Sequence, residues 1–190
     1  MPGIDLTLFR AINGWPDSLA PVMRTLSTAH EGWPFRIVML AIVIAMICKG
    51  GMFRRAAILA LVAFPITDFL CTTAKKTFPM HRPFQEIADV LVRVGKSNSM
   101  GTASSHAGNL AAVATVMTLC LGIRWGAPWI VLAIMVGFSR VYVGVHYPSQ
   151  VLFGWTLGVC VGFLAVTLVR RVFDRPKDPA PSEESADNKE

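Results

Sequence analysis

Two histidines and three basic residues stand out because they interrupt or border stretches that are otherwise apolar. His106 follows a pair of serines, and His146 lies six residues after Arg140. Lys75 and Arg82 flank six residues of a polar connection. An ionisable group at membrane depth is a functional hypothesis by default. These residue types predict chemistry on an anion, which the cations would hold while the imidazoles attack or transfer protons.

Three cations gathered at one point would repel one another unless an anion lay between them, and phosphate is the natural candidate. Arginine offers a fork of donors that matches phosphate oxygens, and lysine offers a point charge. Ser104 and Ser105 open an apolar run, where the backbone N–H groups of a helix start favour an anion. Phosphoryl transfer depends mainly on positioning and charge stabilisation. His146 could therefore attack phosphorus as a neutral imidazole while His106 protonates the departing oxygen.

The sequence favours a mechanism that needs neither a metal nor another cofactor. It contains no HExxH motif, no Walker loop and no carboxylate cluster with metal-ligand spacing. The net charge of +6 forms no continuous basic stripe, so nucleic-acid binding is not expected. The four cysteines lie in apolar segments without CxxC spacing, which argues against a zinc site or disulfides: Cys48, Cys71, Cys120 and Cys160.

The composition is that of a membrane protein. Of the 190 residues, 53% are hydrophobic and only 16% are charged. We predict an all-α integral membrane bundle of about five transmembrane helices. Its membrane-embedded domain would cover residues 1–172, with residues 1–32 as an interfacial segment. The predicted spans are roughly 35–48, 56–73, 104–121, 129–143 and 148–169, as judged from apolar length.

The two ends of the chain are predicted to lie outside the bundle. Residues 4–12 and 19–26 carry apolar side chains at helical spacing with charges between them, which favours amphipathic helices in the membrane interface. Residues 1–16 lack the features of a cleavable signal peptide. Residues 173–190 are rich in Pro, Asp, Glu and Ser and predict a disordered cytoplasmic tail.

The order of the spans predicts which side of the membrane carries the polar residues. A long polar connection, residues 74–102, follows the second span, and a tight turn at Arg124–Pro128 follows the third. Five crossings bring the three polar clusters to one face. The opposite face has short flanks rich in Lys and Arg, which marks it as cytoplasmic. The site is therefore expected to face the extracytoplasmic side.

The three clusters resemble the motifs of the type 2 phosphatidic acid phosphatase (PAP2) superfamily in their order and spacing. The family pattern is K-x6-RP, then PSGH, then SR-x5-H-x3-D. In this chain Lys75 leads to Arg82–Pro83, and residues 103–106 stand at the second motif. Ser139–Arg140 then leads to His146. The resemblance covers residues 70–155.

The resemblance implies a role for each matched residue. His146 would attack phosphorus and become a phosphohistidine, and His106 would protonate the leaving group. Within the superfamily, the short chain and five spans look like the bacterial undecaprenyl-diphosphate phosphatases, which implies the bacterial cytoplasmic (inner) membrane. The phosphate oxygens would be held by Lys75, Arg82, Ser104, the backbone N–H of Ser105, and Arg140.

The resemblance leaves the substrate open, because the motifs indicate the headgroup and not the lipid tail. Undecaprenyl diphosphate is the best expectation. Phosphatidylglycerophosphate, phosphatidic acid and lipid A phosphates are alternatives, as is phosphotransfer to an acceptor other than water. The expected partners are a lipid phosphate and the bilayer, and the sequence does not determine the number of subunits.

Three positions depart from the family pattern. Ala103 replaces a proline and Ser105 replaces a glycine. Gln150 stands where the family has the aspartate that orients the nucleophilic histidine. A glutamine oxygen can fix the histidine tautomer, but it brings no charge to stabilise an imidazolium. A lipid-phosphate binder or transporter with weakened catalysis is therefore the alternative function.

Two further polar residues are candidates to support the histidines. Asp68 could supply the missing carboxylate, and Asn109, one turn after His106, could orient that histidine. The remaining histidines are interpreted as ordinary residues: His30 as interfacial and His81 as part of a loop.

Overall fold

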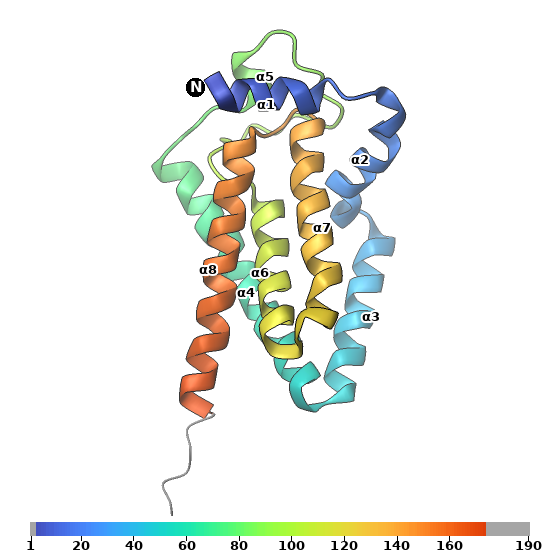
Figure 1. Cartoon of the computed structure of the whole chain (residues 1–190), viewed down its shortest axis with the longest axis vertical. Helices are drawn as coiled ribbons and strands as arrows, with labels where there is room; N and C mark the ends of the chain where they lie inside the picture. Colours follow the sequence, from blue (N-terminus) through green and yellow to red (C-terminus); the bar gives the residue numbers. More distant parts are fainter. Residues whose placement is uncertain (1–2, 174–190) are drawn as a thin grey trace, which may run out of the picture.

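The computed structural model describes residues 3–173, which form helices joined by loops (Figure 1). The predicted all-helical class is confirmed, whereas the predicted tail beyond Phe173 lies outside the described residues. In chain order the elements are α1 (Gly3–Asn13), η1 (Asp17–Leu19), α2 (Ala20–Thr28), η2 (Ala29–Glu31), α3 (Trp33–Lys49), α4 (Gly51–Thr77), α5 (Pro83–Glu86), α6 (Ser105–Leu121), α7 (Ile123–Tyr142) and α8 (Pro148–Phe173).

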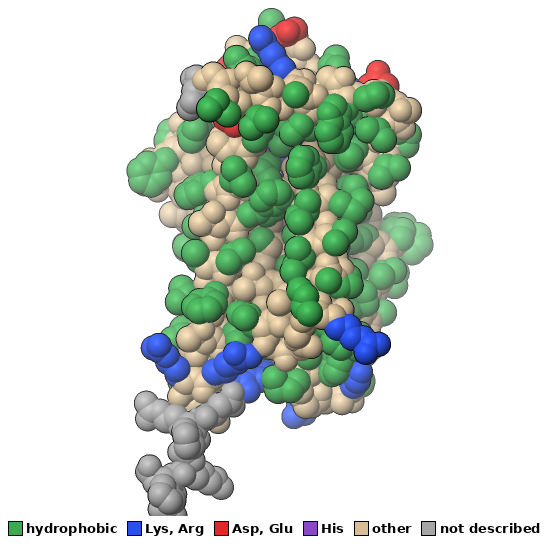
Figure 2. Space-filling model, in the orientation of Figure 1, with side chains coloured by type: hydrophobic (Ala, Val, Ile, Leu, Met, Phe, Trp, Pro, Cys, Tyr) green, Lys and Arg blue, Asp and Glu red, His purple; other side chains and the backbone are tan. Residues whose placement is uncertain are grey.

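The bundle has the dimensions and surface of a multi-pass membrane protein. Helices α4, α7 and α8 are each long and apolar enough to cross a membrane. Segment 17–31 and α3, bent by 65° at their junction, make a fourth candidate if the pair is taken as one span, so the described residues hold three to four candidates where about five spans were predicted. Helix α6 is apolar but has 17 residues, about 25 Å of helix. Apolar side chains cover the middle of the surface in Figure 2, and Lys and Arg gather at its lower end.

Two predicted boundaries differ from the structure. Helix α4 continues to Thr77, so Lys75 lies on the helix rather than in the polar connection. The predicted turn at Arg124–Pro128 is wrong, because α7 already begins at Ile123. The chain reverses instead at Gly122, whose φ of +84° is readily available to glycine. Pro128 lies inside α7, where its missing N–H removes a single hydrogen bond near the helix start.

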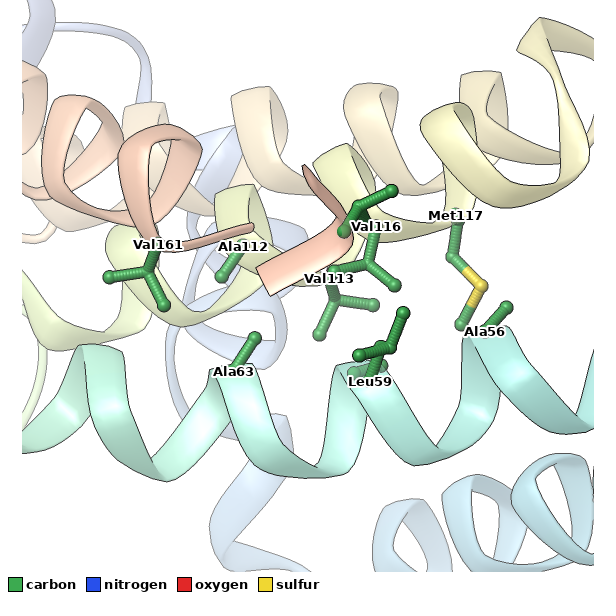
Figure 3. Close-up of a cluster of buried hydrophobic side chains, with 10 residues drawn as sticks. Ala56, Leu59, Ala63, Ala112, Val113, Val116, Met117 and Val161 are labelled. Atoms are coloured by element: carbon green, nitrogen blue, oxygen red, sulfur yellow. The ribbon is translucent and has the colours of Figure 1, made fainter. Parts of the chain in front are cut away.

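Helix α6 lies at the centre of the bundle and packs against α4, α7 and α8. The core on its α4 side consists mostly of small and branched side chains, including Leu59, Ala63 and Ala112 (Figure 3). Small residues let helix backbones approach closely, which drives association in lipid, where the hydrophobic effect between helices is weak.

A stripe of three glycines brings α8 against α6. Gly154, Gly158 and Gly162 are spaced four residues apart and therefore share one face of α8. A Cβ on Gly154 would lie 2.5 Å from the carbonyl oxygen of Ser104, and one on Gly162 would lie 2.8 Å from that of Ala112. The stripe thus fixes the start of α8 against the start of α6.

Helix α1 lies across one end of the bundle, above the start of α8 (Figure 1). The carboxylate of Asp5 accepts hydrogen bonds from the backbone N–H of Ser149 at 2.9 Å and from its hydroxyl at 2.6 Å. Phe9 is buried against Tyr147, with ring centroids 5.4 Å apart. The amphipathic segment predicted for the interface therefore also covers the loop that carries His146.

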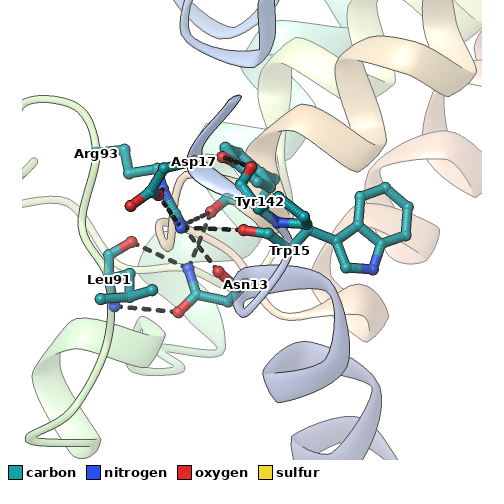
Figure 4. A network of polar contacts seen from close by, with 7 residues as sticks. Asn13, Trp15, Asp17, Leu91, Arg93 and Tyr142 are labelled. Carbon is teal, nitrogen blue, oxygen red and sulfur yellow. Dashed lines mark hydrogen bonds and ion pairs between the residues drawn. The ribbon is translucent and has the colours of Figure 1, made fainter. Parts of the chain in front are cut away.

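A polar network holds the loop around Leu91 against the bundle (Figure 4). The Nδ2 of Asn13 donates to the carbonyl oxygens of Leu91 at 3.0 Å and Tyr142 at 2.9 Å. Arg93 donates to Tyr142 O at 2.9 Å and pairs with Asp17 at 2.8 Å. The long connection after α4 is thus tied to both α1 and the end of α7.

Candidate active site

The three polar clusters meet at one end of the bundle, as predicted from the order of the spans. The end of α4 supplies Lys75, the start of α6 supplies Ser104 to His106, and the end of α7 supplies Arg140. The loop before α8 supplies His146. Most of the Lys and Arg side chains visible in Figure 2 gather at the opposite end.

His146 is held in one tautomer by its neighbours. Its Nδ1 lies 3.1 Å from Oε1 of Gln150 and 3.2 Å from the carbonyl oxygen of Gly101. Both oxygens can only accept, so Nδ1 carries the hydrogen. Its Nε2 lies 3.3 Å from Nη1 of Arg82, which can only donate. The lone pair is therefore on Nε2, where a nucleophile needs it.

Gln150 is itself fixed by two further hydrogen bonds. Its Oε1 accepts from the backbone N–H of Tyr147 at 3.2 Å, and its Nε2 donates to the carbonyl oxygen of His81 at 2.8 Å. A carboxylate could not make the second bond. A Cβ on Gly101 would lie 2.7 Å from Oε1 of Gln150, so this contact also requires the glycine. Gln150 thus orients the imidazole without adding a charge.

The environment keeps the His146 ring neutral. The side chain is only 2% exposed. This burial lowers the pKa of His146 well below its usual value, and the charges of Arg82 and Arg140 lower it further. A neutral imidazole at physiological pH is the form that can attack phosphorus.

Arg82 is fixed by carbonyl and hydroxyl oxygens of two loops. Its Nε donates to the carbonyl oxygen of Ser99 at 2.7 Å, and its Nη2 donates to the hydroxyl of that residue at 2.9 Å. Its Nη1 donates to Val145 O at 3.1 Å. The guanidinium is 3% exposed, and burial lowers the pKa of Arg82. None of these partners is a carboxylate, so they leave its positive charge unneutralised.

Two buried polar atoms near these cations have no hydrogen-bond partner. One is Nε of Arg140, whose Nη1 donates to the hydroxyl of Ser27 at 2.6 Å and to its carbonyl oxygen at 3.1 Å. The other is the hydroxyl of Ser104, the residue that precedes α6. Unpaired buried polar groups are costly and rare. A phosphate oxygen could satisfy both.

Lys75 and the supporting residues complete the site. The Nζ of Lys75 donates to the hydroxyl of Ser105 at 2.9 Å. Asp68, two turns earlier on α4, interacts electrostatically with Lys75 and accepts a 3.5 Å hydrogen bond from Asn109. The structure therefore places Asp68 and Asn109 together. Neither of them orients His146 in this structure, because the oxygens of Gln150 and Gly101 occupy the Nδ1 side of its ring.

The second histidine contacts a residue that the sequence interpretation left out of the site. Nε2 of His106 lies 3.0 Å from Nε2 of His30, and the ring planes meet at 81°. His30 and Ser27 both come from the bent segment before α3, which packs against α7. Local spacing carries no signal for this contact, because it depends on how the segment folds back on the bundle.

Within residues 3–173, no three His, Cys, Asp or Glu side chains are grouped to hold a metal ion. The charged groups around His146 that act on it electrostatically are Lys75, Arg82 and Arg140, and the same three act on His106. The arrangement can bind a phosphate and present a neutral imidazole to it.

Comparison with known proteins finds relatives of this chain in sequence and in fold. The putative undecaprenyl-diphosphatase YbjG of Escherichia coli K12 is 30% identical over 171 residues, 89% of this chain and 84% of that protein. An undecaprenyl-diphosphatase of Sulfolobus acidocaldarius is 31% identical over 118 residues, 60% of this chain. The matched region spans 56% of that relative's length. The crystal structure of Aquifex aeolicus LpxE shares the fold, with a TM-score of 0.75 and 21% identity over 87% of this chain and 96% of that one.

The family profile described as PAP2 superfamily matches residues 56–174, more than half of the chain. The matched region contains all three motifs and the helix ends that carry them. The structure brings these motifs together around His146. The chain therefore belongs to the PAP2 superfamily of membrane phosphatases, the family that the motif spacing had indicated.

Proposed function

We propose that this protein hydrolyses the terminal phosphate of a membrane lipid diphosphate, with undecaprenyl diphosphate as the best candidate. The observation that carries the proposal is the neutral His146, whose Nε2 lone pair faces the guanidinium of Arg82. Family membership and the two undecaprenyl-diphosphatase relatives support both the reaction and the substrate.

In the first half of the reaction, Nε2 of His146 attacks the terminal phosphorus. A nitrogen–phosphorus bond forms as the bond between phosphorus and the bridging oxygen breaks. The three cations hold the phosphate oxygens together with Ser104 and the backbone N–H of Ser105 at the start of α6. A proton from His106 goes to the departing lipid monophosphate.

In the second half, water releases the phosphoryl group. Its oxygen attacks phosphorus, the bond to Nε2 of His146 breaks, and inorganic phosphate leaves. Gln150 and Gly101 keep the imidazole in the same orientation through both halves. Charge stabilisation therefore comes from the cations around the phosphate, and no carboxylate is required beside Nδ1.

The site is proposed to face the extracytoplasmic side of a bacterial cytoplasmic membrane. Support comes from the basic residues near the opposite ends of the helices, since short cytoplasmic flanks are rich in Lys and Arg. They include Lys49, Arg54, Arg55, Arg124, Arg170 and Arg171, whereas Arg175 and Lys177, which the sequence also assigns to this side, lie outside the described residues.

A lipid-phosphate binder is the second candidate, because Gln150 lacks the charge of the family's aspartate. In the Ser-His-Asp triad, replacing the orienting aspartate by asparagine costs about 10⁴ in kcat through the wrong tautomer. Here the hydrogen bonds of Nδ1 to Gln150 and Gly101 set the productive tautomer, which favours the enzyme.

The test is phosphate release by the detergent-solubilised protein from undecaprenyl diphosphate, phosphatidylglycerophosphate, phosphatidic acid and a lipid A phosphate, with a chelator present. We expect the fastest release from undecaprenyl diphosphate, and the His146→Ala variant should release none. A phosphotransferase would instead require added acceptor.

Three outcomes would count against parts of this proposal. Binding of the lipids without phosphate release by the unmutated protein would favour the binder. Loss of release in chelator that returns with added metal would contradict a metal-independent reaction. Faster release from another lipid would keep the chemistry and change the substrate.

A further inference from the structure

His30 and His106 form a contact that the three sequence motifs do not explain. Their Nε2 atoms are 3.0 Å apart and their ring centroids 4.2 Å apart. A nitrogen–nitrogen hydrogen bond requires a hydrogen on one Nε2 and a lone pair on the other. One hydrogen therefore lies between the Nε2 atoms of His30 and His106.

The charges around the pair differ from one ring to the other. His106 is under the influence of three cations, so a proton held by that ring alone would be repelled. His30 has a carboxylate beside it, since Oε1 of Glu31 lies 3.9 Å from its Nε2. The charged groups that act on His30 are Glu31, Arg140 and Arg36, and those on His106 are Arg140, His30 itself when it is protonated, Lys75 and Arg82.

The two rings also differ in their access to water. The side chains of His30 and Glu31 are 45% and 69% exposed. His106, in the first turn of the central helix α6, is half-buried, whereas His30 is exposed. His30 is therefore the ring of the pair with the greater access to solvent. The same bent segment supplies Ser27 to Arg140, so it contributes to both the phosphate-binding and the acid–base parts of the site.

We propose that His30 and His106 act as one acid–base unit, in which His30 shares the proton that His106 delivers to the leaving group. This inference rests on the proposed phosphatase function. His30 acts through His106 and does not contact the substrate. Protons on both rings at once would repel each other, so the pair carries a single charge, which sharing places partly beside Glu31.

The proton balance closes over one turnover. Before attack, each Nδ1 carries its own hydrogen and one further proton is shared between the two Nε2 atoms. When the bond from phosphorus to the leaving oxygen breaks, the shared proton moves from Nε2 of His106 to that oxygen. When water attacks the phosphohistidine, one water proton returns to Nε2 of His106 and the pair regains its shared proton.

The test compares the unmutated protein with His30→Gln, a residue that can hydrogen-bond to His106 but cannot carry the proton. With the best lipid substrate, we expect kcat to fall about 10²-fold, the lower end of general acid–base effects, with KM unchanged. The basic limb of the pH profile should move to lower pH, because an isolated His106 among three cations loses its proton more readily.

A second variant separates proton transfer from packing. In His30→Ala, added imidazole should raise kcat at least tenfold, because the position of the missing ring is accessible to solvent. The matched control is Arg24→Gln, which replaces an exposed basic side chain of the same segment. This variant should keep both kcat and the pH profile.

Two results would overturn the inference and leave the phosphatase function standing. One is a His30→Gln enzyme with the unmutated kcat and pH profile. The other is a His30→Ala enzyme that imidazole fails to restore while His30→Gln is fully active, which would indicate a packing role. An unmutated protein that releases no phosphate from any lipid would overturn both proposals.

Discussion

Gln150 shows how an uncharged residue can do the orienting work of a carboxylate. Its oxygen fixes the hydrogen on Nδ1 of His146, and its amide nitrogen anchors the side chain to the loop at His81. The charge that the family's aspartate would bring is absent. Burial and the nearby guanidinium groups therefore keep the pKa of His146 low, and in the proposed reaction these cations favour the bound phosphate.

Replacing Gln150 by glutamate should change the pH dependence of the reaction. A carboxylate 3.1 Å from Nδ1 favours the protonated ring and so raises the pKa of His146. The nucleophile must be neutral, so activity is lost as pH falls through that raised pKa. We expect the acid limb of kcat/KM to move up by about one to three pH units.

The matched control for this prediction is Gln85→Glu. Gln85 lies in the same region, and its Oε1 accepts from the backbone N–H of Arg82 at 2.8 Å, a bond that glutamate can keep. Its acid limb should stay close to that of the unmutated enzyme. An acid limb that stays in place in Gln150→Glu would contradict the role assigned to Gln150.

The site residues with motif spacing could be predicted from the sequence, because their spacing reflects fixed positions at helix ends. His30, Ser27 and Gly101 could not. His30 and Ser27 reach the site only through the bend before α3, and Gly101 matters through its carbonyl oxygen and its lack of a Cβ. Neither property appears in local spacing or residue type.

Among the elements, the contact between α6 and α8 determines how the two halves of the site are placed. The glycine stripe of α8 lies against the backbone of α6 from Ser104 to Ala112. The backbone N–H of Ser104 also donates to the carbonyl oxygen of Gln150 at 3.0 Å. The distance between the start of α6 and the loop that carries His146 therefore depends on small residues.

Gly158→Val should disturb this contact and the chemistry together. A Cβ there would collide with the carbonyl oxygen of Gly108. Overpacking of this kind typically costs about 1–3 kcal/mol. We expect a lower melting temperature in detergent and a reduced kcat, because α6 must move away from α8. Cys160→Val, on an exposed part of the same helix, should leave both unchanged, and an unaffected Gly158→Val would show that the contact tolerates side chains.

The elements were largely predictable from apolar length, and the exceptions have physical causes. Pro128 suggested a helix start that Gly122 actually sets. Helix α4 continues beyond the apolar part of the predicted second span. Its last turn carries Lys75, which donates a hydrogen bond to Ser105. The glycine stripe was readable in the sequence as a four-residue repeat, Gly154-x3-Gly158-x3-Gly162, but it predicts a partner helix only once the bundle is known.

At the scale of the whole molecule, the two ends of the bundle differ in chemistry. One end combines the site with α1 and the polar loops, and the other gathers Lys and Arg at helix ends (Figures 1 and 2). Under the positive-inside rule, we propose that the end with basic helix flanks is cytoplasmic and that the site faces the other side.

Thiol labelling of intact cells tests that orientation. In a background without the four native cysteines, Asn98→Cys, in an exposed loop at the site end, should react with a membrane-impermeant maleimide. Arg171→Cys, at the other end, should react only after the cells are permeabilised. The reverse pattern would place the site in the cytoplasm and remove the extracytoplasmic assignment.

The bend of 65° before α3 joins two contacts of the site in one segment. In that segment His30 lies against His106, and Ser27 accepts hydrogen bonds from Arg140. A change in the bend angle would therefore move both contacts together, so the proposed proton sharing and the position of Arg140 depend on the same joint.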